Sequence, residues 1–171
     1  MVFSYIYSRP LRSIFLFIIG MVLVWAVLMH CIRRAAGFRR RLNMVLLLAA
    51  VAGVLYLTVF SRESRDAELV LIPFYSFWEA KEQPEMYRSM LMNLFLFVPV
   101  GLVMPFALPQ HVSCKIVITV VFAAMLSGGI EIVQYVWGLG RCEVDDVIMN
   151  ALGAGVGACS FRLNRLRRRV C

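Results

Sequence analysis

The sequence predicts an all-α membrane protein, a polytopic bundle of about five transmembrane helices that forms one domain over residues 1–171. Composition is the first reason, because 61% of the residues are hydrophobic and only 16% are charged, whereas a soluble domain carries roughly a quarter charged residues. The second reason is a series of apolar stretches, each close to the roughly 17–25 residues with which a helix spans the hydrocarbon core. The third is the position of the arginines, which gather in two clusters separated by an even number of predicted crossings.

Each predicted span is an apolar stretch bounded by polar or basic residues. A signal peptide is the alternative for the first stretch, but the run is long for a signal-peptide core, no A-x-A-like site follows, and Arg33 and Arg34 come directly after it. The last stretch is the least regular, because two aspartates and an asparagine lie in its first turns. The predicted spans are residues 13–32, 43–60, 90–108, 116–137 and 144–161.

The basic residues give the predicted orientation. One cluster lies between the first two spans and the other follows the last, so both lie on the same side, which the positive-inside rule makes cytoplasmic. The N-terminus is then outside and the C-terminus cytoplasmic. The net charge of +8 reflects topology and the lipid surface, and nucleic-acid binding is excluded. The clusters are Arg33, Arg34, Arg39, Arg40 and Arg41, and Arg162, Arg165, Arg167, Arg168 and Arg169.

The longest hydrophilic segment is the predicted outer loop, residues 61–89. Within it, the run LVLIPFYSFW at 69–78 is apolar but too short to span a membrane. Its aromatic residues favour an interfacial or re-entrant element, and an ordinary loop with an aromatic anchor is the alternative. Pro73 disfavours a helix at the residue before it, so a bend is expected there.

Cysteine and histidine spacing predicts no disulfide, no metal site and no cofactor. Of the five cysteines, only Cys142 is predicted to lie outside, so no pair shares an oxidising compartment. His111 and Cys114 are three residues apart, but two such groups fall short of a four-ligand zinc site.

The third and fourth predicted spans carry polar residues near their outer ends. Asn93 lies one turn inside the third span, where a packing hydrogen bond between helices is the simplest interpretation. In the fourth span, Ser127, Glu131 and Gln134 share one helical face. Glu131 lies about 9 Å from the outer end at 1.5 Å per residue, which is too deep for its carboxylate to reach water easily.

The fifth predicted span has a polar upper half and a strip of small residues below it. Asp146, Asn150, Gly153 and Gly157 are spaced four, three and four apart, so they share one face. If the strip docks against Gly128 and Gly129 of the fourth span, the two polar faces converge at the outer leaflet. Arg141, in the connecting turn, would then lie above both faces.

Two interpretations of this polar group remain open. One is a structural ion pair of Arg141 with Asp146 or Glu131 that closes the helical hairpin. The other is a functional pocket, which we favour because so many polar groups are expensive in lipid. The candidate ligand-binding residues are Asn93, Glu131, Gln134, Arg141, Asp145, Asp146 and Asn150.

Three segments of the chain also resemble the VanZ-like family of bacterial membrane proteins. They are IPF at 72–74, NLFLFVPVGLVMP at 93–105 and EIVQYVWGLGRCEVDDVIMNALGAGVG at 131–157, so the resemblance covers about two thirds of the chain. It implies a multi-pass protein of the bacterial plasma membrane and the cell envelope, associated with resistance to glycopeptide antibiotics, notably teicoplanin-type lipoglycopeptides. The family's polar positions fall here on Asn93, Glu131, Gln134, Arg141, Asp146 and Asn150.

Three functions are consistent with these features. The first is a binding or resistance protein for an amphiphile, either a lipoglycopeptide or a cell-envelope lipid, with Arg141 on an anionic group. The second is an intramembrane enzyme that acts on a lipid-linked precursor, with Glu131 and Asp146 as acid and base. The third and least favoured is an amphiphile transporter, because polarity stops at the outer half and no inverted repeat is evident. Membrane lipid is the expected partner, and the sequence names no protein partner.

Overall fold

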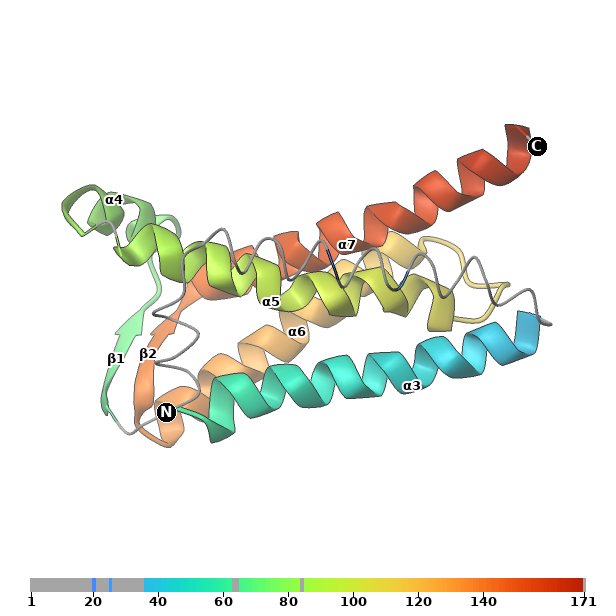
Figure 1. Cartoon of the computed structure of the whole chain (residues 1–171). Helices are drawn as coiled ribbons and strands as arrows, with labels where there is room; N and C mark the ends of the chain where they lie inside the picture. The colour runs from blue at the N-terminus through green and yellow to red at the C-terminus, as the bar shows by residue number, and fades with distance from the viewer. Residues whose placement is uncertain (1–19, 21–24, 26–35, 63–64, 84, 171) are drawn as a thin grey trace.

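The computed structural model describes residues 36–62, 65–83 and 85–170, together with Gly20 and Trp25. Its long helices lie side by side and alternate in direction (Figure 1). They are α3 (Ala36–Leu55), α5 (Glu85–Ala107), α6 (Lys115–Val136) and α7 (Val144–Val170). A π-helical turn, η1 (Tyr56–Phe60), extends α3. Three short elements lie at the end of the bundle where α3 and α6 end and where α5 and α7 begin. These are β1 (Arg65–Val70), α4 (Tyr75–Glu82) and β2 (Leu139–Glu143), and we call this end of the bundle the capped end.

Three of the predicted spans are confirmed as long apolar helices. By length and composition, the segments Gly37–Phe60, Met86–Ala107 and Lys115–Val136 could each cross a membrane. The fifth predicted span, 144–161, lies within α7, which is not among those three. The first, 13–32, lies outside the described residues except for Gly20 and Trp25. The protein is therefore a helical membrane protein, and the count of five spans and the orientation stay predictions.

The two arginine clusters mark the end opposite the capped end. Arg39, Arg40 and Arg41 lie in the first turns of α3, and Arg162 lies in the last part of α7. Because the helices alternate in direction, these positions lie at the same end of the bundle (Figure 1). The sequence-based expectation that the two clusters lie on the same side agrees with this arrangement, and most acidic residues lie at the capped end.

The glycine strip of α7 packs against α5, so the predicted docking on α6 is wrong. A Cβ atom on Gly153 would overlap the carbonyl oxygen of Leu94 in α5, and one on Gly157 would overlap that of Val98. Gly128 and Gly129 of α6 have no atom within 4 Å of an added Cβ. The lack of a side chain at Gly153 and Gly157 lets the backbones of α5 and α7 approach closely. α6 contacts α7 through side chains instead.

α5 lies at the centre of this packing. Phe97 and Val100 are fully buried within it, and they belong to a core that also includes Val54 of α3, Ala123 of α6 and Ala154 of α7. Pro99 and Pro105 lie inside α5 without ending the helix. α5 therefore packs against α3, α6 and α7 and sets their positions relative to one another.

A two-stranded parallel sheet was not expected from the sequence, which predicts helices alone. β1 pairs with β2 so that Glu68 lies opposite Arg141 and Val70 opposite Glu143. The pairing joins the loop after α3 to the turn between α6 and α7, far apart in the chain. It brings the loop carboxylates to the polar ends of α6 and α7.

Candidate functional site

The candidate site lies at the capped end, where the last turns of α6 meet the first turns of α7 (Figure 1). Six residues with polar side chains gather there on three helices, and we call them the polar cluster. Five of them are buried, and Asn93 is half-buried. The cluster consists of Asn93, Ser127, Glu131, Gln134, Asp146 and Asn150.

Asp145 lies beside the cluster and caps the short helix α4. Its Oδ1 accepts a hydrogen bond from the backbone N–H of Phe74 at 2.6 Å, and its Oδ2 accepts one from that of Ser76 at 2.8 Å. A carboxylate at this position satisfies amide groups that a helix leaves unpaired and complements its dipole. Asp145, predicted as a ligand-binding residue, therefore has a structural partner in the IPF segment.

This cap holds the backbone of Phe74 in an unusual conformation. Phe74 has a φ of 64°, in the left-handed region, which costs a residue with a side chain about 1–2 kcal/mol. The hydrogen bond from its N–H to Asp145 helps to offset that cost. The bend that Pro73 predicts is present at Ile72, and a turn follows it at Pro73 and Phe74.

Glu143 connects α4, β2 and α6. Its Oε2 accepts a hydrogen bond from Ser76 Oγ at 2.8 Å, and its backbone N–H donates to Glu131 Oε2 at 3.0 Å. Glu143 is not among the candidate residues that the sequence predicts. Its burial, at 9% exposure, could have been inferred only from the pairing of β2 with β1.

Arg141 is surrounded by carboxylates, but not by the predicted ones. Its Nη1 lies 3.0 Å from Glu79 Oε2, and its Nε lies 3.0 Å from Glu68 Oε2 and 3.3 Å from Glu143 Oε1. The Nε contacts are ion pairs by distance without the alignment of a hydrogen bond. The predicted pairing with Glu131 or Asp146 is wrong, because strand pairing and α4 place nearer carboxylates beside the guanidinium.

The surroundings of Arg141 keep it charged. Burial lowers the pKa of Arg141, but the hydrogen bond to Glu79 and the charges of Glu143, Glu79 and Glu68 outweigh burial and raise it above its usual value. The side chain therefore joins β1, α4 and β2 as a permanent cation. We call these four residues the Arg141 network.

Two buried carboxylates of the polar cluster, Glu131 and Asp146, lie near the half-buried Arg62 that follows η1. The charges of Glu131 and Asp146 act on each other, and the charge of Arg62 acts on both. Arg62 Nη1 donates to Gln134 Oε1 at 3.3 Å, and Gln134 Nε2 donates to the backbone oxygen of Thr58 at 2.9 Å. Thr58 lies in η1, and π-helical turns are often found at functional sites. Sequence reasoning did not identify Arg62, which carries the positive charge that faces both acids.

Two amides of the cluster have a side-chain atom without an aligned hydrogen-bond partner. Asn150 Nδ2 donates to Ser127 Oγ at 2.7 Å, but Asn150 Oδ1 is buried with no hydrogen-bond partner among the described residues. Asn93 interacts with the Asp146 carboxylate, yet its buried Nδ2 is not aligned for a hydrogen bond to any described residue. Buried polar atoms are nearly always paired. Asn150 Oδ1 is therefore left as an acceptor for a water molecule or a ligand, whereas Asn93 Nδ2 faces the Asp146 carboxylate.

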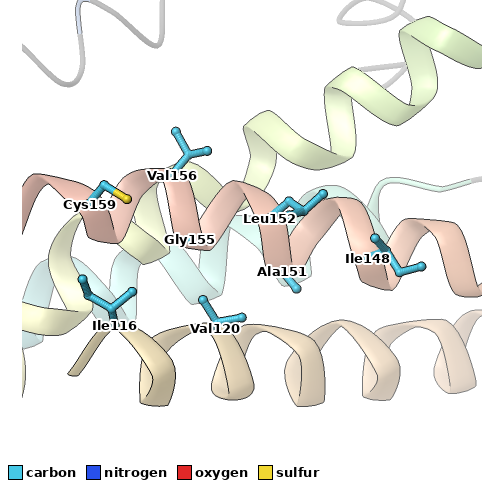
Figure 2. A pocket seen from close by; sticks show the side chains of 8 residues that line it. All are labelled: Ile116, Val120, Ile148, Ala151, Leu152, Gly155, Val156 and Cys159. Carbon is cyan, nitrogen blue, oxygen red and sulfur yellow. The ribbon is translucent and has the colours of Figure 1, made fainter. Parts of the chain in front are cut away.

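An apolar groove runs between α6 and α7 (Figure 2). Its volume is about 540 Å³, and its lining side chains are apolar. It begins near the capped end at Ile148, which points away from Asp146 because residues two positions apart in a helix do not share a face. The lining residues are Ile116, Val120, Ile148, Ala151, Leu152, Gly155, Val156 and Cys159.

Comparison with known proteins assigns the chain to a family. The model of the VanZ/LLP1 family matches residues 44–165, which is most of the chain. The chain belongs to the VanZ/LLP1 family. The resemblance seen in the sequence is thereby confirmed, and with it a link to glycopeptide resistance at the level of the family. No curated protein and no solved structure matches the chain.

All the candidate residues of this VanZ/LLP1 protein lie within the matched region. The structure brings together Asn93, Glu131, Gln134, Asp146 and Asn150, whereas Asp145 and Arg141 belong to the surrounding contacts. Whether any of them binds a ligand stays a prediction. The residues that sequence reasoning did not include are Arg62, Glu68, Glu79 and Glu143, and only their tertiary contacts identify them.

Cys142 shows the electrostatic character of the capped end of this VanZ/LLP1 protein. Partial burial raises the pKa of its thiol, and the charges of Glu131, Asp146 and Glu143 raise it further. The nearby carboxylates therefore make the electrostatic potential at the thiol negative. Among the described residues, no group of three or more His, Cys, Asp or Glu side chains could hold a metal ion.

Proposed function

We propose that this VanZ/LLP1 protein binds an amphiphile at the outer face of the bacterial plasma membrane. The polar head lies at the polar cluster, and the tail lies in the groove between α6 and α7. The observations that support this proposal are an apolar groove along α6 and α7 and, at the end of the same two helices, a buried polar cluster with an unpaired acceptor, Asn150 Oδ1. A molecule with a hydrogen-bonding head and a hydrocarbon tail suits both parts.

The charges at the capped end indicate which head groups of a ligand suit the polar cluster. Arg141 faces three carboxylates, so its charge is more than neutralised and it is poorly placed to attract an anion. Arg62 also lies near the cluster, and it faces Glu131 and Asp146. Heads rich in hydroxyl, amide or amine groups therefore suit the cluster better than phosphate or carboxylate. This replaces the sequence-based expectation that Arg141 binds an anionic group.

Candidate ligands are lipoglycopeptide antibiotics of the teicoplanin type and lipids of the cell envelope. Both combine a polar head with a hydrocarbon tail. Binding of the antibiotic in the membrane would keep it from its target, which would account for a contribution to glycopeptide resistance. Binding of an envelope lipid would alter the supply of that target.

A matched pair of glycine variants tests the proposal. Gly155 lines the groove, and Gly129 lies on the exposed face of α6 with open space around it. Gly155→Leu fills the groove and should weaken binding of a tailed ligand at least about tenfold, as native mass spectrometry of protein in nanodiscs would measure. Gly129→Leu makes the same change outside the groove and should leave binding unchanged. Equal binding by both variants would contradict the tail site.

One observation favours a second candidate, an intramembrane enzyme acting on a lipid-linked precursor. Glu131 and Asp146 are buried carboxylates that interact with each other, and such pairs can divide the roles of acid and base. Glu131→Gln separates the two candidates. An enzyme would lose turnover while still binding substrate, and a binding protein would bind more weakly without any change in the mass of its ligand.

A further inference from the structure

The short helix α4 and the bend before it present a continuous apolar surface. Ile72 is 65% exposed and Trp78 is 72% exposed, although both are large hydrophobic residues. Aromatic side chains make up most of the remainder. We call this surface the α4 apolar face, and it consists of Leu71, Ile72, Phe74, Tyr75, Phe77 and Trp78.

The opposite side of α4 is attached to the rest of the protein. Ser76 and Ala80 are buried, and Glu79 holds Arg141. The amides at the start of the helix are held by Asp145. These contacts fix the orientation of α4, so the aromatic side chains on its outer side remain exposed.

The position of α4 in the chain indicates what covers this face. α4 ends at Glu82, and the candidate membrane span of α5 begins at Met86. The last residue of the apolar face, Trp78, therefore precedes the start of that span by eight positions. With eight residues, α4 is far too short to cross the roughly 30 Å hydrocarbon core. Tryptophan and tyrosine are enriched at the membrane–water interface of membrane proteins, because their rings have an apolar body and a polar edge.

We infer that the α4 apolar face is a membrane anchor that inserts into the headgroup region of the leaflet at the capped end. It fixes the depth of the polar cluster below the surface, because Asp145 and Arg141 connect α4 to that end of α6 and α7. The partner is the lipid surface itself, next to the membrane-spanning part of α5. The amphiphile site proposed above could fail without affecting this assignment.

The charges of this segment indicate hydrophobic rather than electrostatic attachment. Among the side chains described over residues 67–83, Lys81 is the single cation, beside Glu68, Glu79 and Glu82. Lys81 Nζ lies 4.8 Å from the centre of the Trp78 ring, as a cation–π contact. Attachment to anionic lipid needs a cluster of basic residues. The anchor should therefore hold in zwitterionic lipid and at high salt.

Fluorescence quenching in nanodiscs of phosphatidylcholine tests this inference. The probe is the part of the tryptophan signal that Trp78→Phe removes from the otherwise natural protein, so the folded full chain is used throughout. Lipids brominated near the headgroup should quench that signal more than lipids brominated near the chain ends. Raising the salt concentration should leave the quenching unchanged.

A buried tryptophan provides the control. Trp25 is 9% exposed and packs against Phe106, so the signal lost on Trp25→Phe should be weakly quenched by any brominated lipid. Trp78 quenched by aqueous acrylamide and not by brominated lipid would place the face in water and overturn the inference. Trp78 quenched by neither would show that protein covers the face, which also overturns it. Quenching that disappears at high salt would contradict hydrophobic anchoring.

Discussion

At the scale of single residues, the capped end depends on carboxylates that bind backbone and arginine groups from other elements. Asp145 holds α4 through two backbone amides, and Glu131 holds the residue before α7 through the N–H of Glu143. Arg141 joins three elements through its guanidinium. Asp145, Glu131 and Arg141 therefore each have a structural role, and ligand binding by the polar cluster stays a prediction.

Asp145→Ala should free α4 while leaving the helical bundle intact. Loss of a capping carboxylate costs about 0.5–2 kcal/mol, so hydrogen exchange at the amides of Phe74 and Ser76 should become faster. Ser127→Ala removes a buried hydroxyl that does not contact α4 and should leave exchange there unchanged. Unaltered exchange in Asp145→Ala would show that α4 does not need this cap.

Arg141→Lys keeps the charge but loses the fork that contacts several carboxylates at once. Because the structure gives Arg141 protein partners, the midpoint of thermal unfolding should fall, and ligand binding per folded molecule should stay the same. The measurement is thermal unfolding in detergent together with binding in nanodiscs. A loss of binding at unchanged stability would instead assign Arg141 to the ligand.

The Cys142 thiol should react slowly at neutral pH. Burial and nearby carboxylates raise its pKa, so less thiolate is present at pH 7 than for an ordinary cysteine, and the rate should increase only at higher pH. A variant that keeps Cys142 alone, alkylated by iodoacetamide across a pH series, measures this. Glu143→Gln removes one of the charges and should move the profile to lower pH, while the protein unfolded in detergent gives the ordinary profile.

At the scale of elements, the closest contact is the one between α5 and α7. The carbonyl oxygens of Leu94 and Val98 occupy the space that side chains at Gly153 and Gly157 would need. Such a contact places Asn93 of α5 beside Asp146 of α7. The geometry of the polar cluster therefore depends on Gly153 and Gly157, which have no functional side chain of their own.

Gly153→Ala should destabilise the protein, whereas Gly155→Ala should not. The added Cβ at Gly153 meets the Leu94 backbone and should cost about 1–3 kcal/mol through overpacking. At Gly155 the added Cβ lies 3.5 Å from Val120 Cγ2, which is an ordinary contact, and alanine favours a helix by up to about 1 kcal/mol over glycine. Thermal unfolding of the two variants decides, and equal losses would count against the α5–α7 interface.

At the scale of the whole molecule, charge is divided between the two ends. Arginines lie at the start of α3 and late in α7, and the carboxylates of the Arg141 network lie at the capped end. The positive-inside rule predicts that the arginine end faces the cytoplasm. The capped end, the polar cluster and the α4 apolar face would then lie outside.

Cysteine labelling tests this orientation. In variants with one cysteine each, Cys142 at the capped end should react in intact cells with a membrane-impermeant maleimide. Cys114, which is exposed at the opposite end, should react only after permeabilisation, and the same is expected of Cys171. The reaction should be run at alkaline pH because of the raised pKa of the Cys142 thiol. Labelling of Cys114 in intact cells would reverse the orientation.

Particular residues show how far the sequence predicts the site. Glu131, Gln134, Asp146 and Asn150 could be grouped because each pair lies on one face of a single helix, and helical periodicity is a local property. The partners of Arg141 could not be predicted. Glu68 and Glu79 lie 73 and 62 positions away in the chain, and their approach depends on strand pairing and on the placement of α4.

The sequence by itself determined the class of protein, three of its apolar helices, its family and the positions of most polar residues. It did so because span length, composition and helical periodicity are local properties that each segment carries on its own. The tertiary structure alone decided that the glycines of α7 dock on α5, that Arg141 joins β1, α4 and β2, and that Arg62 faces the two buried acids. Those contacts depend on which backbones approach closely and which strands pair, and both are set by the packing of the whole chain.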